Sequence, residues 1–89
     1  MPVISMFYGL IVRLYSFDVD RHKLPHLHVE YGGNEAVVAI PTGEILTGAF
    51  PSNKLKLLHA WMEIHQDELL ADWKLAVNGE PIFRIDPLR

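Results

Sequence analysis

The chain has 89 residues, of which 49% are hydrophobic and 21% charged, and its formal net charge is −3. This composition predicts one globular domain and excludes a disordered chain, while the absence of cysteine excludes disulfides and thiolate sites. No apolar run approaches the roughly 20 residues of a membrane span, and the first residues lack a signal-peptide pattern. We therefore expect a single cytoplasmic domain over residues 1–89, with no membrane segment. Its negative charge argues against a nucleic-acid partner.

The first half of the chain has the alternation and the β-branched content of strands. Gly9 marks a first turn, Gly32-Gly33-Asn34 a second and Pro41-Thr42-Gly43 a third. We expect strands, in chain order, over residues 3–7, 10–15, 26–31, 35–40 and 44–47. The third and fourth of these flank a glycine-rich turn, which predicts an antiparallel hairpin.

From Pro51 onward the apolar residues recur at helical spacing, which predicts helices over residues 54–64 and 68–77. Residues 81–85 are expected to form a closing edge strand, because proline is tolerated at a strand start. Strands followed by helices predict an α+β fold, with an antiparallel sheet of four to five strands and two helices packed on one face. The residues expected in the core are Leu27, Val29, Leu58, Trp61, Leu69 and Trp73.

Three histidines, His22, His26 and His28, lie within seven residues of each other. Alternate residues of a strand share a face, so His26, His28 and Glu30 are expected to project together. Because Pro25 restricts the chain before it, we expect His22 to fold back over that face. Imidazole is the side chain most used for proton transfer near neutral pH and for binding transition metals.

A His-x-His pair on a strand is a recurrent metal-ligand arrangement, so His22, His26 and His28 are candidate ligands of a divalent transition metal. An alternative is acid–base catalysis, in which a histidine held by a carboxylate acts as general base on RNA or another ester. A third is purely structural, with half-exposed histidines of which one bonds a loop carboxylate. The nearby carboxylates are Asp18, Asp20, Glu30 and Glu35.

The chain resembles the small bacterial family catalogued as domain of unknown function 4160, whose core pattern is His-x-Pro-Pro-His-x-His-x-x-Tyr. The segment from His22 to Tyr31 carries this pattern, with Leu24 in place of the first proline. The resemblance extends over nearly the whole chain, and the family's recurring polar positions correspond to His22, His26 and His28. The other matching segments are residues 2–15, Trp61 to His65 and Leu69 to Trp73.

The resemblance implies a small bacterial protein that is often encoded beside another short protein, and some relatives carry a toxin–antitoxin-like label. It therefore favours a protein-interaction module of a two-gene system, with a small protein encoded nearby as its partner. The competing hypothesis is a small metal- or histidine-dependent hydrolase or nuclease, centred on His22, His26 and His28. A free sheet edge or an exposed apolar patch would favour the first, and imidazoles converging in a pocket the second.

Overall fold

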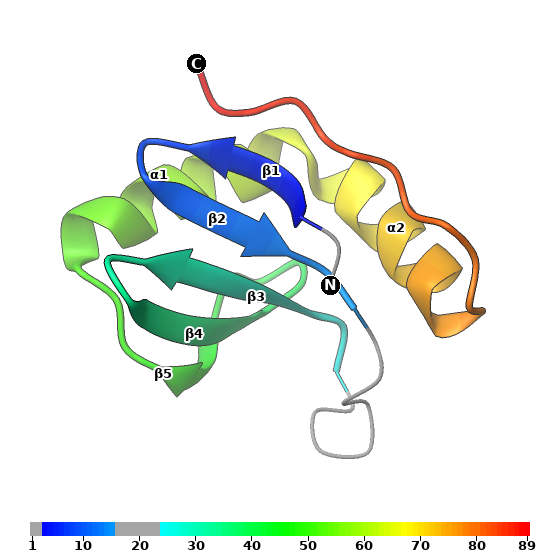
Figure 1. Cartoon of the computed structure of the whole chain (residues 1–89), viewed down its shortest axis with the longest axis horizontal. Helices are drawn as coiled ribbons and strands as arrows, with labels where there is room; N and C mark the ends of the chain where they lie inside the picture. The colour runs from blue at the N-terminus through cyan, green and yellow to red at the C-terminus, as the bar shows by residue number, and fades with distance from the viewer. Residues whose placement is uncertain (1–2, 16–23) are drawn as a thin grey trace.

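Five strands and two helices make up the computed structural model, which describes residues 3–15 and 24–89 (Figure 1). The predicted α+β fold is confirmed, with the strand count at the upper end of the expectation. The strands are β1 (Val3–Phe7), β2 (Leu10–Arg13), β3 (His26–Tyr31), β4 (Asn34–Ala39) and β5 (Ile45–Gly48). The helices are α1 (Ser52–Ile64) and α2 (Gln66–Val77).

The sheet is antiparallel throughout, and its strands follow one another in chain order from β1 to β5. Phe7 pairs with Leu10 across the first turn, and Tyr31 pairs with Asn34 across the second. All four central residues of these two turns have positive φ. Positive φ at both central residues is the type I′ turn, whose twist matches that of the flanking strands. Glycine adopts positive φ without strain, which explains the glycines in both turns. The predicted hairpin is confirmed, with β4 beginning one residue earlier than expected.

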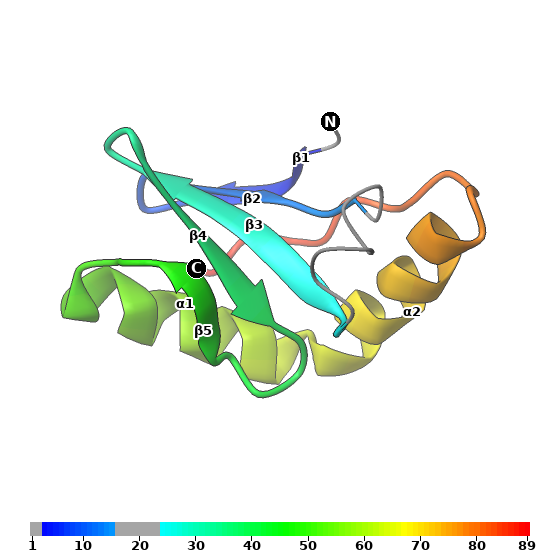
Figure 2. The ribbon, with the colours of Figure 1, turned by 90° about the horizontal axis from the view of Figure 1, so that it is seen from below.

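Both helices pack on one face of the sheet, where α1 runs beneath the strands and α2 continues past one end (Figure 2). The six residues expected in the core are all buried, and the most exposed of them, Trp73, shows only 9% of its surface. Within the described ranges, neither helix has the length and apolar character needed to cross a bilayer.

The prediction of an edge strand over residues 81–85 is wrong, because within residues 3–15 and 24–89 this segment forms a single backbone hydrogen bond with the sheet. The Ile85 N–H donates to the Ile4 carbonyl at 2.8 Å. The N–H two residues earlier, that of Phe83, donates instead to the Asp72 carboxylate of α2 at 3.0 Å. The segment therefore crosses from α2 to β1 as an extended strap (Figure 1).

Burial of the Asp72 side chain predicts a pH dependence of stability. Desolvation raises the pKa of Asp72 above its ordinary value of 3.8, the Phe83 N–H lowers it, and the charge of Glu68 raises it again. Because the folded state holds this proton more tightly than the unfolded state, the contribution of Asp72 to stability is lost as pH rises through its folded pKa. We expect Asp72→Asn to remove this loss.

Urea unfolding between about pH 4 and pH 7 measures the effect as the stability of Asp72→Asn minus that of the wild type. That difference should increase with pH. Glu68→Gln is the matched control, because it removes one cause of the raised pKa and should give a smaller change of the same sign. A difference that decreases with pH would contradict the assignment.

Candidate functional site

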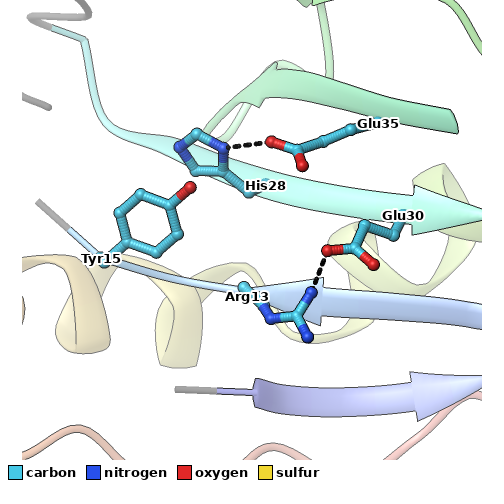
Figure 3. A pocket seen from close by; sticks show the side chains of 5 residues that line it. All are labelled: Arg13, Tyr15, His28, Glu30 and Glu35. Atoms are coloured by element: carbon cyan, nitrogen blue, oxygen red, sulfur yellow. Dashed lines mark hydrogen bonds and ion pairs between the residues drawn. The ribbon is translucent and has the colours of Figure 1, made fainter. Parts of the chain in front are cut away.

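The face of the sheet away from the helices carries a polar pocket of about 370 Å³. Strand register places Arg13 opposite His28 and Glu30 opposite Glu35. Alternation directs the side chains of Leu27 and Val29 to the other face, where the helices pack. The pocket therefore gathers side chains from β2, β3 and β4, together with that of Tyr15, which follows β2 (Figure 3). Its lining residues are Arg13, Tyr15, His28, Glu30 and Glu35.

His28 is held by Glu35 across the β3–β4 hairpin. The two side chains meet through His28 Nδ1 and Glu35 Oε1 at 3.1 Å, and the His28 side chain is only 9% exposed. A carboxylate can only accept, so Nδ1 carries the proton and Nε2 carries the lone pair when the ring is neutral. The Tyr15 ring stacks on the imidazole, with centroids 4.1 Å apart (Figure 3). The ring is thus fixed in both tautomer and plane.

A second ionic contact in the pocket joins Arg13 of β2 to Glu30 of β3 (Figure 3). Glu30 and Glu35 are direct cross-strand partners, and like charges in that position repel. Arg13 compensates the charge of Glu30, whereas Glu35 contacts an imidazole that is charged only when protonated. The pocket therefore carries a surplus negative charge while His28 is neutral, and that surplus is located at Glu35.

His26 lies next to His28, as strand alternation predicts, with ring centroids 5.4 Å apart. Its Nδ1 donates to the Leu24 carbonyl at 2.7 Å, and Trp73 of α2 packs 4.9 Å from its ring. His26 is completely buried and His28 nearly so. The expectation of half-exposed histidines is therefore wrong, because Trp73 covers one ring and Tyr15 the other.

The third member of the predicted cluster, His22, lies outside the described residues, as do Asp18 and Asp20. In the part of the chain that the structure does describe, no group of three or more histidines and carboxylates is arranged to hold a metal ion. The metal site over His22, His26 and His28 therefore stays a prediction. The remaining histidines make structural contacts elsewhere, His59 with the Gly43 carbonyl and His65 with Glu68.

Sequence reasoning found His28, Glu30 and Glu35 but missed Arg13 and Tyr15. Arg13 ends β2 and Tyr15 lies two residues further on, so continued alternation would place both on one face. Which residues of β3 they would meet depends on the register between β2 and β3. The segment that joins β2 to β3 is long, so no short turn fixes the register between these two strands.

One comparison with known proteins gives a match. A family model described as "Domain of unknown function (DUF4160)" matches residues 9–74, nearly three quarters of the chain. The matched span includes all five lining residues of the pocket, and it leaves out β1 and the strap after α2. No curated protein and no solved structure matches the chain.

Proposed function

The chain belongs to the DUF4160 family, and we propose that the pocket on its open sheet face is the active site of a small histidine-dependent hydrolase. The observation that carries this proposal is the contact between His28 and Glu35. An imidazole that is nine-tenths buried in a polar pocket, with Nδ1 bonded to a carboxylate, has the arrangement of a general base.

In the proposed reaction, His28 Nε2 takes a proton from a water molecule as the water oxygen attacks an ester carbon. The resulting imidazolium then gives that proton to the leaving oxygen as the bond to carbon breaks. Glu35 is the positioning residue, because it holds the tautomer and stabilises the imidazolium. The Arg13 guanidinium, held by Glu30, lies in the same pocket and would stabilise negative charge that develops on the attacked group. Water is the proposed nucleophile, since the described lining has no serine, threonine or cysteine.

A metal-dependent form of the same hydrolase is supported by the bonds of both described histidines. His26 donates from Nδ1 to a backbone carbonyl and His28 from Nδ1 to a carboxylate. Metal-binding histidines usually make such a bond through the ring nitrogen that does not hold the ion. In this form His22, His26 and His28 would be the protein ligands, and the metal would activate the water.

Hydrolysis by the purified, untagged protein tests the proposal. The substrates are nitrophenyl acetate, nitrophenyl butyrate and bis-nitrophenyl phosphate, with and without a chelator. We expect the wild type to cleave at least one ester, and His28→Asn to lose this activity by a factor of about 100 or more. His65→Asn is the matched control, because His65 lies at the end of α1 outside the pocket. If no substrate is cleaved in a His28-dependent way, the hydrolase proposal is wrong.

Thermal unfolding with zinc, manganese or nickel separates the two forms. A metal held by His26 and His28 should stabilise the wild type by about 2.7 kcal/mol at a hundredfold excess over the dissociation constant. The effect should weaken at about pH 5.5, because protons compete for imidazole. The double variant His26→Ala/His28→Ala should show no such stabilisation. A melting point that no metal changes at about pH 7.5 would leave only the metal-free form.

An interaction module of a two-gene, toxin–antitoxin-like system is the second proposed function, and exposed apolar surface supports it. Met6 and Tyr8, at the end of the β1–β2 hairpin, have 56% and 54% of their surface exposed. The proposed partner is a small protein encoded nearby. Co-purification of that protein with the wild type, but not with Met6→Asp, would support this role. Equal co-purification with both would show that this hairpin is not the contact.

A further inference from the structure

A second cavity of about 500 Å³ adjoins the His28 pocket, and we call it the anchor cavity. Glu35 is a lining residue of both spaces, so they meet at this residue. Strands β5 and β4 lie close together here: a Cβ added to Gly48 of β5 would lie 2.3 Å from the Glu35 carbonyl oxygen. A ligand that occupies both spaces would therefore pass directly over Glu35. The lining residues of the anchor cavity are Asn34, Glu35, Gly48, Ala49, Phe50 and Pro51.

The lining of the anchor cavity fits a flat cation better than an anion. Its lining residues include Glu35, Asn34 and Phe50, and no basic residue is among the described lining residues. Glu35 has 52% of its side chain exposed, and only one of its oxygens is bonded to His28. Arg13 compensates the neighbouring carboxylate, Glu30, so the negative charge left over in this region is that of Glu35. A phosphate group would meet repulsion here.

We propose that the anchor cavity binds a guanidinium or amidinium group of the substrate and places the adjoining ester bond against His28. The planar N–H donors of such a group match the geometry of the Glu35 carboxylate, and its face can stack on Phe50. The substrate class is then an ester carrying a flat cationic group, such as an arginine derivative. This inference rests on the hydrolase proposal for the question of which bond is cleaved, but the binding preference can be measured separately.

Binding is tested with benzamidine and its neutral isostere benzamide, followed by amide NMR spectra of the full chain. Benzamidine should shift the backbone amides of Asn34, Gly48 and Ala49, and benzamide should bind at least about tenfold more weakly. Glu35→Gln should weaken benzamidine binding by about the same factor. Glu63→Gln is the matched control, because Glu63 is an exposed carboxylate of α1 outside both cavities.

Phe50→Leu is a second variant that leaves the carboxylate in place, and it should weaken benzamidine binding several-fold. Equal binding of the two probes would overturn the inference, as would amide shifts confined to other residues. His28→Asn separates the two proposals, because it should abolish hydrolysis and still bind benzamidine. His28-dependent cleavage of neutral esters without benzamidine binding would leave the hydrolase standing and remove the anchor cavity's role. Selective benzamidine binding without any hydrolysis would support the binding role of the anchor cavity and show that the hydrolase proposal is wrong.

Discussion

Truncation of Trp61 to alanine is expected to destabilise the protein by about 3–5 kcal/mol. Trp61 of α1 is fully buried, its ring lies 5.2 Å from that of Phe7, and its Nε1–H donates to the Asp86 carbonyl at 2.7 Å. The side chain therefore joins the helix layer to the sheet and to the residue that directly follows the strap. Total stabilities of about 5–15 kcal/mol are usual, so this one change removes a large share. Each kcal/mol should lower the melting temperature by about 4–8 °C in a domain of this size.

Two further variants identify the cause of the Trp61 effect. Trp61→Phe keeps most of the apolar contact and loses the indole donor, so it should cost clearly less than alanine. Phe83→Ala is the matched surface control, because Phe83 is 72% exposed and should cost about 0.5 kcal/mol or less. Urea unfolding measures all three. A Trp61→Ala protein as stable as the Phe83→Ala protein would contradict the packing described for the core.

The second large effect concerns catalysis, where His28→Asn is expected to lower kcat/KM by a factor of about 100 to 10,000. Glu35→Gln should lower it by about 10 to 100, because Glu35 acts by orienting the imidazole. The two losses should not multiply: once His28 is replaced, the further loss of Glu35 removes nothing that the ring used. The measurement is a double-mutant cycle on whichever ester the wild type cleaves, with circular dichroism confirming that each variant is folded.

A purely structural role for Glu35 predicts a different pattern in the same cycle. In that case Glu35→Gln would lower the activity of His28→Asn by the same factor as it lowers that of the wild type. Its melting temperature would also decrease together with its activity. A multiplicative pattern would therefore remove Glu35 from the proposed mechanism, while His28 would keep its role.

Local patterns predicted most of this fold because most of its elements are set locally. The turn at Gly32-Gly33 fixes the β3–β4 register by itself, and the apolar spacing after Pro51 fixes both helices within two residues. The strap over 81–85 was mistaken for a strand because its composition suits either structure. Its conformation is decided by a distant acceptor, the carboxylate of Asp72, which takes the Phe83 N–H.

The candidate site was predictable only along single strands. Alternation identified His26, His28 and Glu30 as neighbours on one face, and the hairpin register adds Glu35. Arg13 and Tyr15 join them through the pairing of β2 with β3, which a sequence pattern does not specify. The burial of His26 was also missed, because it depends on where α2 places Trp73.

The chain-ordered sheet also has a kinetic consequence. Each strand pairs with the strand next to it in sequence, so the sheet can assemble by successive local steps with little loop-closure entropy. The bond between Ile85 and Ile4 instead joins the two ends of the chain, and we expect it to form after the helices have docked. The strap is thus expected to be the last part to fold and the first to open. Its amides should exchange with solvent hydrogen well before those of the central strands.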